Sequence, residues 1–343
     1  MGQHIPLYRS HAMKSPVIPL SILDLCPVNV GATPADALHN SLALARFAEQ
    51  QGYHRFWVAE HHNMVGIASA ATSVVIGYLA AGTERIRIGS GGIMLPNHSP
   101  LQIAEQFGTL ESLYPGRIDL GLGRAPGTDM ATARALRRGR TDGEDFPQML
   151  DELRHYFATP ASGQRLVAVP GAGLEVPIWL LGSSTFSAQL AASLGLPFAF
   201  AGQFSPDYMM AAMQGYREAF QPSAQLERPW AMLGINAFVA ETRDQAHYLA
   251  SSHQQSFLNM IRGDRGQLRP PVQDMDELWQ PHERHQVMST LAGTLIGDEQ
   301  TVARQMAELI ERYGVDELIV NSPIFDQQQR RDSYRRLMHA ACL

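Results

Sequence analysis

Short apolar runs alternate with helical patterns along almost the whole 343-residue chain, and this alternation limits the possible folds more than any other feature. Runs of strand length occupy residues 17–25, 56–59, 85–95, 117–122, 177–181, 197–201, 230–239 and 317–321. Helical patterns separate and follow them, at 34–51, 70–81, 99–113, 144–157, 184–194, 206–220, 244–261, 300–313 and 327–340. Strands joined through helices pair in parallel. We therefore predict an α/β fold, a closed (β/α)8 TIM barrel, with a doubly wound open sheet as the alternative.

Two segments are too long to be ordinary connections. Residues 158–176, after the fourth strand, contain three glycines and two prolines and predict a small hairpin insertion. Residues 263–286, after the seventh strand, are rich in proline, arginine and glutamine and predict an excursion over one face of the barrel. We expect residues 1–16 to form a flexible tail and residues 17–343 to form one domain.

Composition narrows the class of protein. Apolar residues make up 45% of the chain and charged residues 17%, which suits a large core and not a disordered protein. The net charge of −6 argues against a nucleic-acid partner. Two cysteines are too few for a disulfide scaffold, and no apolar run has the length of a signal peptide or a membrane span. We predict a cytoplasmic protein with no membrane partner.

The most informative local stretch is residues 117–127, which read Arg-Ile-Asp-Leu-Gly-Leu-Gly-Arg-Ala-Pro-Gly. The alternating apolar residues predict a strand that ends in a glycine loop, and glycine lets the backbone approach a ligand closely. Arg124 stands at the lip of this loop, and its planar guanidinium suits a phosphate. The stretch therefore predicts an anion site at the carboxyl end of a strand.

Two histidines follow the second predicted strand, in the run Glu60-His61-His62-Asn63. Neighbouring residues of an extended chain point to opposite sides, so His61 and His62 are poorly placed to share a metal. No zinc-type spacing occurs elsewhere, and we predict no metal site. Histidines bonded to loop carbonyls are the simpler interpretation, while the position at a strand end favours an imidazole that moves protons near neutral pH.

Two further loops carry candidate binding residues. Gly91 and Gly92 interrupt the third strand, which indicates either a plain β-bulge or a flat ligand pressed against the backbone, and the same loop continues to Asn97. Residues 183–187 enter a helix, where free N–H groups, serine hydroxyls and the positive helix end together form a phosphate cradle. Capping needs only one serine, so the excess favours a ligand.

Three common motifs are missing from the sequence. The glycines at 121 and 123 lack the spacing of a Rossmann turn and the acidic strand end that follows it. No Gly-x-x-x-x-Gly-Lys-Ser/Thr loop and no Gly-x-Ser-x-Gly elbow occurs. Nucleotide hydrolysis and serine hydrolysis of these types therefore have no support.

Taken together, these residues resemble the bacterial luciferase-like flavin monooxygenases. The matching pieces are residues 57–62, 85–96, 115–124 and 183–197, and the resemblance runs from about residue 17 to residue 325. It implies a (β/α)8 barrel that binds FMN at the carboxyl ends of its strands. It also implies an enzyme that uses reduced FMN and O2 to oxidise a small organic substrate. A separate flavin reductase would supply the reduced FMN, and the chain would form a homodimer.

The site residues that the resemblance implies lie on the loops after the second to fifth strands. His61 matches the family's catalytic imidazole. Gly91-Gly92 takes the place of a non-proline cis peptide against the flavin ring, and Arg124 and the serines hold the phosphate. The implied cofactor-binding residues are Gly91, Gly92, Asn97, Arg124, Ser183, Ser184 and Ser187. Gly123 stands where luciferases carry a reactive cysteine, so neither light emission nor a long-chain aldehyde substrate is implied.

Two other functions fit the same residues. One keeps the fold and transfers hydride with a deazaflavin. The other is a non-catalytic flavin-binding protein, which the missing cysteine at position 123 leaves open. The organic substrate does not follow from the sequence.

Overall fold

Eight parallel strands form a closed ring in the computed structural model, which describes residues 18–125, 128–137 and 143–343. The ring closes because β10 pairs with β1 on one side and with β8 on the other. The strands are β1 (Leu20–Asp24), β2 (Arg55–Val58), β3 (Arg87–Ser90), β5 (Ile118–Gly123), β6 (Ile178–Gly182), β7 (Phe198–Phe200), β8 (Ala231–Val239) and β10 (Glu317–Asn321). The predicted (β/α)8 barrel is confirmed, and the open sheet was wrong.

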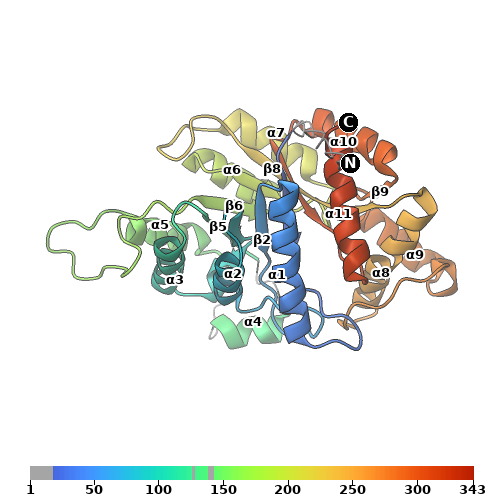
Figure 1. Cartoon of the computed structure of the whole chain (residues 1–343). Helices are drawn as coiled ribbons and strands as arrows, with labels where there is room; N and C mark the ends of the chain where they lie inside the picture. Colours follow the sequence, from blue (N-terminus) through green and yellow to red (C-terminus); the bar gives the residue numbers. More distant parts are fainter. Residues whose placement is uncertain (1–17, 126–127, 138–142) are drawn as a thin grey trace, which may run out of the picture.

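Helices cover the outside of the ring (Figure 1). Those that follow the predicted patterns are α1 (Pro34–Gln51), α2 (Thr72–Ala81), α3 (Pro100–Leu113), α5 (Phe146–Phe157), α6 (Thr185–Leu194), α7 (Met209–Ala219), α8 (Arg243–Ile261), α10 (Glu299–Tyr313) and α11 (Gln327–Ala341). Their ends follow local chemistry: Thr33 and Asp36 form a capping box at the start of α1, and Gly52 ends it in the left-handed conformation. No helix in the described ranges has the length and apolar character needed to span a bilayer.

Several short elements were not predicted. They are β9 (Leu295–Gly297), α4 (Met130–Arg137), α9 (Pro281–Thr290) and the 3-10 turns η1 (Leu95–Asn97) and η2 (Met275–Glu277). The single strand predicted at 85–95 is divided at the glycine pair into β3 and β4 (Ile93–Met94). The hairpin predicted for residues 158–176 was wrong, because no strand is present there and the segment projects from the barrel as a loop (Figure 1). The tail predicted at residues 1–16 and the end of the glycine loop, Gly127, lie outside the described residues.

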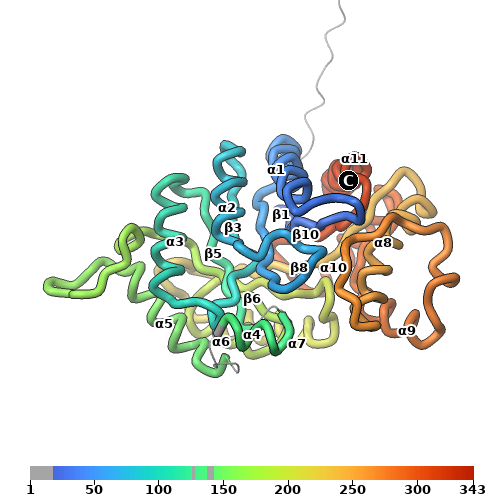
Figure 2. Tube along the Cα trace, turned by 90° about the horizontal axis from the view of Figure 1, so that it is seen from below, coloured from blue at the N-terminus to red at the C-terminus, as the bar shows by residue number. Residues whose placement is uncertain are grey.

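The excursion predicted at 263–286 packs on the barrel mouth, at the carboxyl ends of the strands. We call residues 264–269 the strap. Leu268 donates its N–H to the carbonyl of Val28 and accepts from the N–H of Val30, both at 2.9 Å, so the strap is tied to the loop after β1. The strap also touches the loop after β2, where Gly266 lies against Gly66. The helices before and after the strap, α8 and α9, lie together at one side of the barrel (Figures 1 and 2).

The alternation within the strands divides the core into two parts. One set of side chains packs between the strands and the helices. The other set fills the inside of the barrel, where the rings of Trp57 and Trp179 meet edge to face with centres 5.2 Å apart. The interior is therefore packed and is not a channel.

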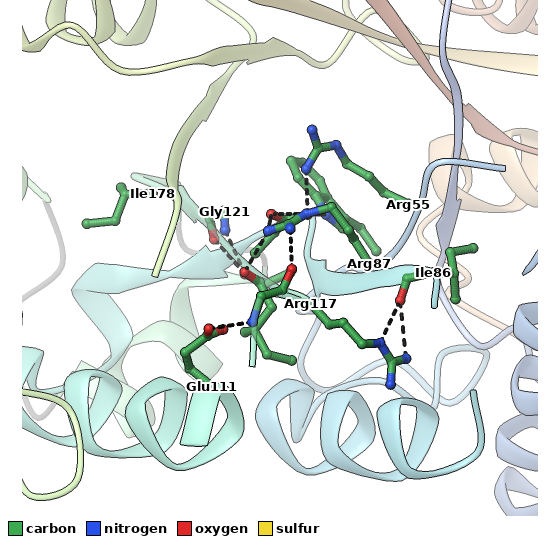
Figure 3. Close-up of polar contacts among 12 residues, drawn as sticks. Arg55, Ile86, Arg87, Glu111, Arg117, Gly121 and Ile178 are labelled. Carbon is green, nitrogen blue, oxygen red and sulfur yellow. Dashed lines mark hydrogen bonds and ion pairs between the residues drawn. The ribbon is translucent and has the colours of Figure 1, made fainter. Parts of the chain in front are cut away.

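Buried charges close the amino-terminal end of the barrel. Asp119 accepts hydrogen bonds from Arg55 Nη1 (2.8 Å) and Arg87 Nη2 (2.6 Å), and the two arginines converge from neighbouring strands (Figure 3). Glu317 accepts from Arg55 Nε (3.0 Å) and from the hydroxyl of Ser21 (2.5 Å). Burial opposes ionisation of Asp119, but the two guanidinium groups outweigh it and lower the pKa of this carboxyl. These five residues form the floor network.

Candidate active site

A buried carboxylate organises the loops at the carboxyl ends of β2 and β3. Glu60, two residues after β2, has no exposed surface. Its carboxylate accepts hydrogen bonds from the backbone N–H of Met94 and from the side-chain amide of Asn97, both at 3.0 Å. Nε2 of His62 lies 2.8 Å from Oε1, and Nε2 of His98 lies 2.9 Å from Oε2. One carboxylate therefore joins the loop after β2 to the loop after β4.

These contacts keep Glu60 ionised. Burial raises the pKa of a carboxyl, but the hydrogen bonds from His62 and His98 outweigh it, and the pKa of Glu60 falls to about 2. Because the carboxylate accepts, Nε2 of each imidazole acts as the donor. The structure places Asn97 in this network, with its amide nitrogen directed to Glu60.

His61 lies on the opposite side of the same extended segment. The backbone N–H groups of Ala59 and Glu60 donate to carbonyls of β1 and of Gly92, so strand pairing continues beyond β2. Ala59 belongs to the apolar cluster inside the barrel. Alternation therefore places His61, which is half-buried, on the side of the barrel mouth and Glu60 on the side of the helices.

A β-bulge interrupts the ladder where β3 gives way to β4. Residues 90–92 lie opposite only two residues of β5, 120–121. The hydroxyl of Ser90 fills the gap, donating to the carbonyl of Gly121 (2.8 Å) and accepting from its N–H (3.0 Å). The bulge interpretation of this glycine pair is confirmed.

The peptide bond between Gly91 and Gly92 is cis, as the resemblance implies. A Cβ atom at Gly91 would lie 2.6 Å from Cδ1 of Leu23, and one at Gly92 would lie 2.7 Å from the carbonyl oxygen of Gly121. A side chain at Gly92 would therefore collide with fixed backbone, whereas one at Gly91 would require the Leu23 side chain to move. The bulge presents bare backbone, which suits close contact with a flat ligand.

Arg124 and the serine turn lie together although they follow different strands. The guanidinium carbon of Arg124, directly after β5, lies 4.3 Å from the ring centre of Phe186 in the first turn of α6. No carboxylate of the described ranges pairs with Arg124, and its side chain is exposed. Ser184 is the N-cap of α6 but makes no side-chain capping bond. A cation and a helix N-terminus with uncapped N–H groups thus share one place.

The other two predicted serines flank Ser184. Ser183 is half-buried before the helix, and Ser187 is buried within its first turn. The structure therefore gathers Arg124, Ser183, Ser184 and Ser187 near the carboxyl ends of β5 and β6. Within the described part of the chain, no group of three or more histidine, cysteine, aspartate or glutamate side chains is placed to hold a metal ion.

Sequence reasoning missed the part that Glu60 and His98 play. Glu60 was visible as an acidic residue directly after a run of four apolar residues, 56–59, and such a position signals a buried carboxylate that needs partners. His98 lies in the loop that also holds Asn97, but nothing local connects it to Glu60.

The geometry agrees with comparisons against known proteins. A family model for luciferase-like monooxygenase matches residues 20–317. The chain is 52% identical over 327 residues to a luciferase-like monooxygenase of Escherichia coli K12, covering 95% of this chain and 98% of the relative. It is 34% identical over 331 residues to the N-acetyl-S-alkylcysteine monooxygenase of Bacillus subtilis, covering 94% and 98%. The crystal structure of apo-MsnO8 aligns with a TM-score of 0.83 at 37% identity, covering 94% and 98%. The chain therefore belongs to the luciferase-like monooxygenase family.

Proposed function

We propose that this chain is a monooxygenase that uses reduced FMN and O2 to oxidise a small organic substrate. Luciferase-like monooxygenases are flavin-dependent, and the barrel presents the chemistry that a flavin phosphate requires. The observation that carries the proposal is the pairing of Arg124 with the uncapped N-terminus of α6. An exposed arginine without a carboxylate partner in the described ranges, set beside free helix N–H groups, suits a terminal phosphate.

In this proposal FMN supplies the reaction with oxygen, while the chain binds, orients and protonates. The serines at 183, 184 and 187 bind the phosphate with Arg124, and Gly91 and Gly92 place their backbone against the ring. Asn97 lies beside the same bulge. His61 acts as the catalytic imidazole and moves a proton at the barrel mouth. The strap keeps water from the mouth on the side of β1 and β2.

Reconstitution of the purified full-length chain tests the proposal. The N-acetyl-S-alkylcysteine in the name of the Bacillus subtilis relative supplies a first probe, N-acetyl-S-methylcysteine. We expect incorporation of one atom of labelled oxygen from 18O2 when reduced FMN is supplied. Turnover only with a reduced deazaflavin would overturn the proposal in favour of hydride transfer. Tight FMN binding without oxidation of any probe in a thioether, aldehyde and ketone panel would favour a flavin-binding protein instead.

Two partners complete the proposal. A separate flavin reductase supplies reduced FMN, and the chain acts as a homodimer. Addition of an unrelated NADH:FMN reductase should support turnover, and light scattering should give twice the mass of the chain. Turnover with NADH and FMN alone would contradict the two-component arrangement.

A further inference from the structure

Two asparagines from neighbouring strands and a glutamine from the loop after β7 are linked by hydrogen bonds at the carboxyl end of the barrel. Asn236 in β8 and Asn321 in β10 are register partners, and Nδ2 of Asn321 donates to Oδ1 of Asn236 at 3.0 Å. Nδ2 of Asn236 donates in turn to the backbone carbonyl of Gln203, just after β7, at 2.7 Å. We call Gln203, Asn236 and Asn321 the amide row.

The amide row faces the inside of the barrel. Met232 and Ile319 belong to the apolar cluster that fills the interior, and the two asparagines lie further along the same strands at even spacing. The carboxamide of Gln203 lies against the backbone of Gly234, where any Cβ would collide with its Oε1. Interior side chains at this end of a (β/α)8 barrel are those that meet ligands.

One atom of the row lacks a partner. Oε1 of Gln203 is buried and accepts no hydrogen bond from the described residues. Buried polar atoms are rarely left in this state, because the lost hydration is not replaced. Each asparagine amide has two N–H donors and uses one of them within the row. The row therefore contains one unused acceptor and unused donors, and all of its groups are neutral.

We propose that the amide row binds a neutral amide-type edge, in which an N–H donor stands beside a C=O acceptor. Oε1 of Gln203 accepts from the N–H, and the second N–H of Asn236 or Asn321 donates to the C=O. Two ligands carry such an edge: the pyrimidine end of a flavin ring and an amide-bearing organic substrate. The naming of these two ligands rests on the proposed function, whereas the chemistry of the row does not.

Calorimetric measurement of binding to the full-length protein, with the flavin probes in their oxidised form, tests the proposal without turnover. The probes are FMN and its N3-methyl derivative, and N-acetyl-S-methylcysteine and its N-methyl derivative. Methylation removes the N–H and keeps the C=O. In the wild type we expect methylation to weaken one of the two pairs by about tenfold, the loss of one buried hydrogen bond.

Gln203→Met removes the unpartnered acceptor with little change of volume, and in this variant we expect the methylation penalty to disappear. Gln214→Met on the exposed face of α7 is the matched control and should retain the penalty. Asn236→Leu removes a donor and should weaken both members of the affected pair equally, which provides a second test if Gln203→Met fails to fold.

The two arms distinguish the sources. A penalty in the FMN pair assigns the row to the flavin, and a penalty in the thioether pair assigns it to the substrate. The inference is overturned if neither pair binds, if methylation has no effect on either pair in the wild type, or if Gln203→Met retains the full penalty. A wild type that binds the thioether pair but not FMN would overturn the proposed function and leave the row to be judged by the thioether pair.

Discussion

The guanidinium carbon of Arg124 lies 4.3 Å from the ring centre of Phe186, so the residue directly after β5 lies against the first turn of α6. This cation–π contact holds the guanidinium beside the start of the helix. Two elements that the sequence separates are joined by this one contact. The proposed phosphate site therefore combines a positive charge with a defined position next to the N-terminus of α6.

Removal of this cation should weaken FMN binding. We expect Arg124→Ala to cost about 2 kcal/mol, roughly thirtyfold in Kd, because charge-assisted hydrogen bonds to the phosphate are lost. Quenching of FMN fluorescence measures the Kd. Arg85→Ala, an exposed arginine before β3, is the matched control. Riboflavin lacks the phosphate and should bind Arg124→Ala and wild type alike, and an unchanged Kd for FMN would show that the assignment is wrong.

Loss of the His61 imidazole should reduce chemistry more than binding. We expect His61→Ala to lower the rate of substrate oxidation by about a hundredfold, because a positioned proton carrier is removed. FMN affinity should change little, since the assigned phosphate contacts are elsewhere. The initial rate of product formation is the measurement, and His247→Ala on the exposed part of α8 is the control. Equal rates in both variants would exclude His61 from the reaction.

Glu60 should make stability depend on pH in strong acid. Its folded pKa of about 2 lies below the ordinary value of 4.5, so the unfolded chain binds the proton more tightly. This contribution, about 3 kcal/mol, is complete above pH 4.5 and is lost as the pH falls towards 2. Glu60→Gln should therefore be less stable at neutral pH and should approach wild type in acid. Urea unfolding at several pH values measures the difference, with Glu218→Gln on the exposed face of α7 as control. A difference that does not change with pH would contradict this account.

His253 should make stability depend on pH in a higher range than Glu60 does. Its ring lies between those of Phe238 and Phe257, and burial lowers the pKa of His253 to about 4. The unfolded imidazole titrates near 6.5, so stability is lost as the pH falls from about 6.5 to about 4, by about 3 kcal/mol. His253→Gln should flatten the stability curve across this window, whereas His247→Gln should not. Parallel curves for wild type and His253→Gln would refute the prediction.

The barrel could be predicted because each unit carries its own local signals. The capping box at Thr33 and the terminal Gly52 mark α1 in the sequence as plainly as in the structure. The three residues of β9 form too short a pattern to be recognised in the sequence, and this strand was not predicted. The hairpin at 158–176 was wrong because glycine and proline indicate turns, whereas paired strands also need alternating apolar residues.

Some features of the candidate site could also be predicted from the sequence, and others could not. The placement of Arg124 and the serine turn at neighbouring strand ends could be predicted, because each follows a strand of the barrel; that they bind an anion stays a prediction. The carboxylate of Glu60 that His62 and His98 share could not be predicted. Its contact with His98 depends on the path of the chain between β3 and β4, which no local sequence pattern indicates. The amide row was also missed, since Gln203 lies in the loop after β7 while Asn236 and Asn321 come from two other strands, and no local pattern connects the three.

The floor network has a consequence for synthesis of the chain. Arg55, Arg87 and Asp119 leave the ribosome early, whereas Glu317 belongs to the last strand and is the second carboxylate that Arg55 binds. Until β10 emerges, β1 and β8 present open sheet edges and the barrel end carries an arginine without its full set of partners. The barrel can therefore close only after β10 has been synthesised. A product that ends before residue 317 keeps unpaired edges on β1 and β8, and such edges can pair with other chains.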